Sequence, residues 1–380
     1  MVNMGDRGRE AAPLRGTAAG WSSQARILSG VGRAFRSQAR HGAAAVAALC
    51  CAGVLAGLGG VSQAAGSVNS SAGRGARVEA IMPLGRVWAS CVYDPALKNI
   101  VLFGGDTGYQ TGPDVVFGRT WTWDGVDWDR RHPETSPSPR TGAAIVFDRA
   151  TRQLLLFGGS MTPGSGGGYL AGTWVWNGGT WTRLHPATSP PARHNADLVY
   201  DRAQHEVILF GGYNGSYLND TWSWNGTTWT QLHPATAPPP RDTHSLVYDP
   251  ASKTAILFGG FNGKRLGDTW SWNGTTWTQL HPATSPGIVS TAWQAAWDTA
   301  SHQLLLFGGD KSRGVFSSST WVWNGNSWTK LHPAVSPAQR SYGSLTYDRE
   351  LHRLVLFGGS TGHTDPVTIW EWNGTTWRHH

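Results

Sequence analysis

The tripeptide Phe-Gly-Gly recurs six times in this chain, at intervals of 48 to 54 residues. Each copy follows an aromatic-aspartate pair and precedes three tryptophans spaced as Trp-x-Trp-x4-Trp. A repeat of this length indicates an array of supersecondary units that bury their apolar faces against one another. The phenylalanines of the six copies are Phe103, Phe157, Phe210, Phe258, Phe307 and Phe357.

Each unit divides into four short strands, as the fourth copy illustrates. The turn Asn273-Gly274 between alternating apolar residues is a strong hairpin signal, because both turn positions require a positive φ. Gly259-Gly260 separates the second strand from the third, and no segment of the repeat has a helical pattern. The expected strands of this copy are Ser245–Tyr248, Thr254–Phe258, Thr269–Trp272 and Thr276–Leu280.

Units of four strands that repeat six times are typical of radial closure. The sequence therefore predicts an all-β fold, a six-bladed β-propeller of four-stranded blades, preceded by an N-terminal export signal. The tryptophans could stack on sugars, but we expect them to fill the space between blades. Each buried tryptophan removes about 150–250 Å² from water, and a domain without disulfides needs such a core.

The diglycine after an apolar strand, the later tryptophans and the arginine before most first strands, which directly follows proline at Arg140 and Arg241, resemble the kelch-repeat family. The resemblance covers Arg86 to the C-terminus. It is strongest to exported bacterial kelch proteins, which are similar to the propeller domain of galactose oxidase. That enzyme uses copper and a tyrosine cross-linked to cysteine, outside the repeat pattern. We do not extend its activity to Cys91 of this chain, and we expect no cofactor and no metal site.

The first 65 residues are typical of an export signal with a long basic leader. An uncharged Ala/Leu/Val/Gly-rich run ends at Val61, and Ser62 and Ala64 are small residues that suit signal-peptidase cleavage. The alternative is an uncleaved membrane anchor. The predicted organisation is a signal region over 1–65, a linker over 66–85 in which 78–83 could form a ring-closing strand, and the propeller over 86–380.

Charge argues against a nucleic-acid partner. The chain has a formal net charge of +7, but the leader carries seven arginines against Asp6 and Glu10. The other 315 residues hold 24 basic and 22 acidic side chains, which is nearly neutral. Binding to phosphate backbones requires clustered Lys and Arg that this region lacks.

One register of the repeat carries a candidate ligand site. Eight residues before each aspartate of the aromatic-aspartate pair stands an arginine, except in the fifth unit, which has a serine. If the first strand is innermost, this register rings the mouth of the central channel. Convergent arginines suit a carboxylate, phosphate or sulfate. The alternative is that each arginine binds backbone carbonyls of its own or the next blade. The register comprises Arg86, Arg140, Arg193, Arg241, Ser290 and Arg340.

The fifth unit and two long loops add further candidates on the same face. The fifth unit lacks the Pro-Arg and places Trp293 where other units have Ala, His or Gly. The loops 106–119 and 160–172 carry Tyr109, Phe117 and Tyr169. Long loops on a rigid scaffold are frequent binding sites.

These observations favour an exported binding module for a carbohydrate or an extracellular protein, monomeric and secreted or held in the cell envelope. The alternative is a mutarotase or epimerase acting on an acidic sugar, with Asp242 and His244, or Asp197 and His194, as candidate acid-base pairs. A structural surface protein without a pocket is a third interpretation. No motif in the sequence identifies a catalytic centre.

Overall fold

The computed structural model describes residues 82–380, except 109–114, 164–166, 288–293, 313–314 and 363–365. The chain divides into two compact units, Met1–Arg74 and Gly75–His380. The predicted export signal over 1–65 and most of the predicted linker lie outside the described residues. The account below concerns the second unit.

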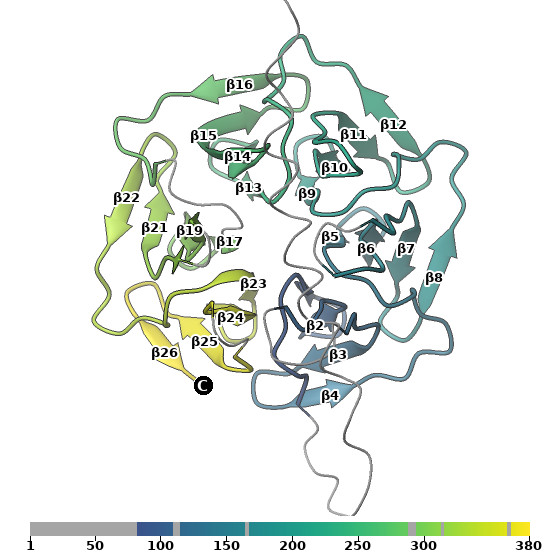
Figure 1. Ribbon diagram of the computed structural model, residues 1–380, viewed down its shortest axis with the longest axis horizontal. Coiled ribbons are helices and arrows are strands. Elements are labelled where there is room, and N and C mark those ends of the chain that lie inside the picture. The colour runs from purple at the N-terminus through teal and green to yellow at the C-terminus, as the bar shows by residue number, and fades with distance from the viewer. Residues whose placement is uncertain (1–81, 109–114, 164–166, 288–293, 313–314, 363–365) are drawn as a thin grey trace, which may run out of the picture. The chain divides into compact units, whose positions relative to one another are not determined.

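Six antiparallel four-stranded sheets form a ring in this unit (Figure 1). In every sheet the strand order follows the chain. Blades 1 to 3 comprise β1 (Ser90–Asp94), β2 (Asn99–Phe103), β3 (Thr120–Trp123) and β4 (Trp128–Arg130); β5 (Ala144–Asp148), β6 (Gln153–Phe157), β7 (Thr173–Trp176) and β8 (Trp181–Leu184); and β9 (Asp197–Asp201), β10 (Glu206–Phe210), β11 (Thr221–Trp224) and β12 (Trp229–Leu232). Blades 4 to 6 comprise β13 (Ser245–Asp249), β14 (Thr254–Phe261), β15 (Arg265–Trp272) and β16 (Trp277–Leu280); β17 (Gln294–Asp298), β18 (Gln303–Phe307), β21 (Thr320–Trp323) and β22 (Trp328–Leu331); and β23 (Ser341–Asp348), β24 (Arg353–Ser360), β25 (Ile369–Trp372) and β26 (Trp377–His379).

The predicted all-β, six-bladed propeller of four-stranded blades is thereby confirmed. The first strand of each blade lies nearest the ring centre and the fourth lies at the rim, as β13 and β16 show in Figure 1. A small extra ribbon of β19 (Asp310–Ser312) and β20 (Val315–Phe316) extends the loop between β18 and β21. No helix is assigned within the described part of the chain.

The ring closes between blades 6 and 1, each of which is built from consecutive residues. The Gly359 amide donates to the Arg86 carbonyl at 3.0 Å, and the Trp88 amide donates to the Tyr342 carbonyl at 2.9 Å. Met82 and Pro83 belong to no strand, and 78–81 lie outside the described residues. A ring-closing strand over 78–83 therefore stays a prediction.

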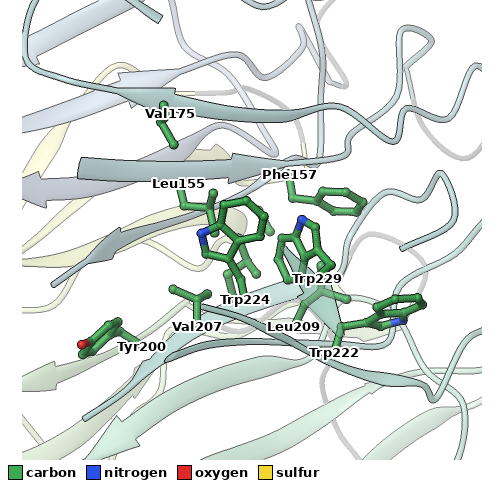
Figure 2. Close-up of a cluster of buried hydrophobic side chains, with 11 residues drawn as sticks. Leu155, Phe157, Val175, Tyr200, Val207, Leu209, Trp222, Trp224 and Trp229 are labelled. Carbon is green, nitrogen blue, oxygen red and sulfur yellow. The ribbon is translucent and has the colours of Figure 1, made fainter. Parts of the chain in front are cut away.

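Tryptophans fill the space between blades, as the spacing predicts. Figure 2 shows Trp224 and Trp229 of blade 3 against Leu155 and Phe157 of blade 2. The Phe157 and Trp229 ring centroids are 5.4 Å apart at an interplanar angle of 61°, an edge-to-face geometry that is favourable for aromatic pairs. The second and third tryptophans of every blade are buried. They are core residues, and their packing between blades holds the innermost strands in place around the channel.

Candidate functional site

The five described arginines of the predicted ring are buried and directed into their own blades. Arg241, at 0% exposure, donates from Nε to the Pro239 carbonyl at 3.0 Å and from Nη1 to the Gly259 carbonyl at 2.8 Å. The other four make the same two contacts, to the carbonyl two residues earlier and to the first glycine of Gly-Gly. These are Arg86, Arg140, Arg193 and Arg340.

Blades 3 and 4 add a carboxylate to this arrangement. Arg193 binds both carboxylate oxygens of Asp220, at 2.6 and 2.8 Å, and the Trp222 indole donates to the same carboxylate at 2.7 Å. Burial alone would raise the pKa of Asp220, but the hydrogen bonds and charge of Arg193 outweigh it and hold that pKa below its ordinary value. Arg241 and Asp268 repeat the pair in blade 4.

The arginine backbone also joins neighbouring blades. In five of the six Gly-Gly pairs the second glycine donates its amide to the arginine carbonyl of the next blade, as Gly105 does to Arg140 at 2.9 Å. The chains approach closely here, because a Cβ on Gly104 would lie 2.4 Å from the Arg140 oxygen. The contacts of this register therefore match the alternative in which each arginine binds backbone carbonyls of its own or the next blade. None of its described arginines lines the cavity at the channel mouth.

The channel mouth is formed instead by the residues two positions after each arginine. Each of them has a left-handed backbone, and Thr243, at φ 50°, is a β-branched residue in a conformation that such residues rarely adopt. Amide-to-carbonyl bonds of 2.8 to 3.1 Å join these residues in sequence from blade 6 through blade 1 to blade 4. Non-glycine residues held this way cost of order 1 kcal/mol each and concentrate at functional sites. We call this ring the collar; its described members are Trp88, Gly142, Asn195, Thr243 and Tyr342.

The collar surrounds a cavity of about 170 Å³. Its wall continues inward along the first strands, through small residues such as Ala89 and Ala143, to Asp197 and His244. The Trp88 and Tyr342 rings stack at 4.4 Å across the junction of blades 1 and 6. The collar side chains differ from blade to blade, in contrast to the repeated arginines. Functional sites in repetitive scaffolds are expected at such departures.

Two histidines beside the cavity are buried without hydrogen-bond partners on either ring nitrogen. Burial lowers the pKa of His244 to about 3 and that of His194 to about 4, so both imidazoles are neutral at pH 7. Asp197 accepts the amides of Leu198 and Leu246, each at 2.8 Å. Neither predicted acid-base pair is hydrogen-bonded, because both histidines lack partners.

Burial also has the largest effect on the pKa values of the two carboxyl groups in those pairs. It raises the pKa of Asp197 to about 7 and that of Asp242 to about 7, against the opposing hydrogen bonds that each accepts. The inner wall of the cavity therefore holds a neutral imidazole and a carboxyl group that titrates near neutral pH.

A row of aromatic side chains extends from the collar across blades 2 to 4. Tyr169 stacks on His194 at 5.3 Å, and His194 meets Tyr213 edge to face at 5.8 Å. Tyr213 packs on Tyr217 at 5.0 Å, and Tyr217 meets Phe261 at 5.8 Å. We call these five rings the aromatic row. Of them the sequence singled out Tyr169 in its loop and His194 as a candidate acid-base residue.

The remaining predicted site residues lie elsewhere. Phe117 is 8% exposed, with the Arg86 guanidinium 4.2 Å above its ring, so it packs inside blade 1. Tyr109, Ser290 and Trp293 lie outside the described residues. The sequence analysis did not single out the collar, although its fixed spacing from the arginines was a usable signal.

Within the described ranges, no three His, Cys, Asp or Glu side chains converge as metal ligands. The described residues also contain no helix of the length and apolarity needed to cross a bilayer.

Comparison with known proteins agrees with this architecture. The family model described as the KLHDC2/KLHL20/DRC7 Kelch-repeats domain matches residues 177–292 and 204–380. No curated protein matches the chain. Kelch propellers are generic protein-interaction modules. The match covers more than half of the chain, and the six four-stranded blades with their Gly-Gly and tryptophan repeats complete the case: this protein belongs to the kelch-repeat family.

Proposed function

We propose that this propeller binds a segment of a protein partner in the collar cavity. The observation that carries the proposal is the contrast between two registers of the same repeat. The arginine register is nearly invariant and buried, whereas the collar, two residues later, varies in every described blade and lines a cavity. A rigid ring whose mouth differs from blade to blade is suited to recognition.

The chemistry of the cavity favours an uncharged, hydrogen-bonding group. Asn195 and Thr243 on the rim and the neutral imidazole of His244 deeper in the wall can donate or accept. The unpartnered nitrogens of His244 are buried, so a ligand that bonds to them relieves the cost of an unsatisfied polar group. A peptide backbone or an amide side chain meets these requirements, and the aromatic row offers apolar contacts beside it.

A carbohydrate is the second candidate ligand, and the aromatic row favours it. Tyrosine rings on a surface can stack on sugar faces while the collar amide and hydroxyl bind sugar hydroxyls. Mutarotation or epimerisation of an acidic sugar, the catalytic alternative, has less support. It needs an acid-base pair, and Asp197 and Asp242 are not hydrogen-bonded to His194 or His244.

The proposed place of action is outside the cytoplasm, as a monomer in the medium or cell envelope. Support comes from the uncharged run before Val61 and the small residues Ser62 and Ala64. N-terminal sequencing of the exported protein tests this. A mature chain that starts near Ala65 supports export by cleavage, and one that retains Arg33 to Arg40 supports the membrane anchor.

Glycine substitutions in the collar test the site without disturbing its backbone. Asn195→Gly and Thr243→Gly remove the side chains but keep a residue that accepts a positive φ. His205→Gly is the matched control, since His205 has φ 59° in an exposed turn away from the cavity. The measurement is capture of proteins from the extracellular fraction, beside binding to a glycan array.

A partner captured by wild type and by His205→Gly, but not by the collar variants, supports the proposal. If wild type and His205→Gly bind a glycan on the array and the collar variants do not, the ligand of the collar is assigned as a carbohydrate instead. Capture that is unchanged in both collar variants contradicts the site.

A further inference from the structure

A second cavity lies at the opposite end of the channel. The first strands run from the collar to the aromatic-aspartate pairs, so the side chains on their last residues line the far mouth. There the structure has a cavity of about 230 Å³, walled by strand residues such as Val92 and Val199. Its polar lining is dominated by three arginines from blades 2, 3 and 6. We call Arg149, Arg202 and Arg349 the arginine cup.

The repeat places these arginines at one equivalent position. Each directly follows the aspartate of the aromatic-aspartate pair, where blades 1 and 4 have proline and blade 5 has threonine. The aspartate fixes the turn that holds the arginine. In blade 3, the Ala203 and Gln204 amides donate to Oδ1 of Asp201 at 2.9 and 3.2 Å. The three guanidinium groups are therefore mounted on rigid turns around one opening.

Aromatic rings of the adjacent blades support the cup. The Arg202 guanidinium carbon lies 5.8 Å from the Tyr248 ring centre, and that of Arg349 lies 5.9 Å from the Tyr93 ring centre. These distances are within the range of cation–π contacts. Arg202 and Arg349 thus reach over the first strand of the following blade, and all three arginines line the shared cavity.

The cup carries positive charge without a partner. None of the three arginines forms an ion pair or hydrogen bond among the described residues, and no carboxylate lines the cavity. Glu350, the exposed acid that follows Arg349 in the chain, instead pairs with Lys98 at 3.4 Å and accepts from Tyr93 at 3.3 Å. Burial, and then the charges of Arg202 and Arg349, lower the pKa of Arg149 to about 10. Arg149 therefore keeps its charge at pH 7, and the like charges of Arg202 and Arg349 repel it.

We propose that the arginine cup binds a small polyvalent oxyanion of the phosphate or sulfate class. Guanidinium groups present planar pairs of donors that match such oxygens, and three of them converging from separate blades match a group with several charged oxygens. The cavity is larger than a single oxyanion needs, so a small organic group attached to the anion can lie against the tyrosines. This site is separate from the collar, and either can fail without the other.

The buried arginine register at the collar end is the contrast that makes the inference specific. There every described arginine is buried and its Nε and Nη1 donate to backbone carbonyls. In the cup the arginines are exposed and their donors have no protein acceptor within the described part of the chain. The same residue type is structural at one mouth and available at the other.

The test uses the full chain and two probes, inorganic pyrophosphate and sulfate, titrated calorimetrically at constant ionic strength with chloride as the reference salt. The variants are Arg149→Gln, Arg202→Gln, Arg349→Gln and the triple variant. Arg183→Gln is the matched control, because Arg183 is an exposed arginine on the outer strand β8. Each cup variant is expected to weaken binding about tenfold, the equivalent of one hydrogen bond to a charged group.

A thermal melt separates binding from a structural role. Without oxyanion, the triple variant is expected to melt at or above the wild-type temperature, because it relieves repulsion and breaks no ion pair. Added pyrophosphate or sulfate should raise the melting temperature of wild type and of Arg183→Gln more than that of the triple variant, and the anion with the larger difference shows which of the two classes the cup prefers. A triple variant that melts lower without anion, or binds the anions as wild type does, overturns the proposal.

Discussion

Trp229 donates its indole N–H to Oγ1 of Thr173, the first residue of the third strand in the preceding blade, at 3.0 Å. The same bond joins Trp181, Trp277, Trp328 and Trp377 to their preceding blades, at 2.9 to 3.0 Å. At the ring closure the corresponding residue is Ile369, and the buried Trp128 indole has no acceptor. A polar bond therefore locks five described junctions, and the sixth depends on apolar packing.

Removing one of these acceptors should weaken the ring. Thr320→Val keeps the shape of the side chain but leaves the Trp377 indole unsatisfied, so we expect a loss of about 1–3 kcal/mol in the free energy of unfolding. Denaturant melts measure it. Thr122→Val is the control, because Thr122 is equally buried but accepts from no indole. Equal losses in both variants would show that the bond contributes nothing.

The Arg193–Asp220 pair should make stability depend on pH. We expect Arg193→Ala to cost about 3 kcal/mol at pH 7, since it leaves a largely buried carboxylate and a glycine carbonyl unpaired. The folded pKa of Asp220 is lowered, so the contribution of the pair is present above the ordinary aspartate pKa. It is lost as pH falls through the folded pKa.

The measurement is a series of urea melts from pH 7 into the acid range. The difference in the free energy of unfolding between wild type and Arg193→Ala should become smaller below about pH 4, the ordinary pKa of aspartate. Arg140→Ala is the control, because Arg140 has no carboxylate partner among the described residues. The difference in unfolding free energy between Arg140→Ala and wild type should stay constant with pH. If the difference becomes smaller by the same amount for both variants, the pH dependence does not come from the Arg193–Asp220 pair.

Asp197 should act on stability in the opposite direction. Burial raises the pKa of Asp197 in the folded protein to about 7, above its value in the unfolded chain. The stability associated with its protonated form is therefore fully present below about pH 4, and it is lost as pH rises through 7. Asp197→Asn removes this titration. Relative to wild type the variant should gain stability between pH 5 and pH 8, which thermal melts at the two pH values can detect. A pH-independent difference would mean that Asp197 stays ionised throughout.

The glycine pairs should tolerate a methyl group only where space allows. Gly158→Ala places a Cβ 2.5 Å from the Arg193 oxygen at a residue with φ +74°. We expect it to cost more than about 3 kcal/mol, or to prevent folding, because it forces two blades apart. Gly325→Ala, at φ +94° with no atom within 4 Å, is the matched control. It should cost only about 1 kcal/mol of backbone strain, and urea melts compare the two. Similar costs would show that the inter-blade contact is not close.

The sequence by itself determined the six blades, the four strands in each and the tryptophan core. These features depend on local sequence signals that occur in all six units, such as the Asn273-Gly274 hairpin and the alternation of Trp270 and Trp272 in the fourth. Only the tertiary structure decided which arginines are available. Arg241 and Arg202 both occur at fixed positions of the repeat, but one faces the carbonyl of Gly259 and the other an open cavity. Arg241 takes its direction from partners in its own blade, and Arg202 lies near Tyr248 of the next blade. Spacing along the chain does not encode these contacts, because the partners come together only in the folded ring.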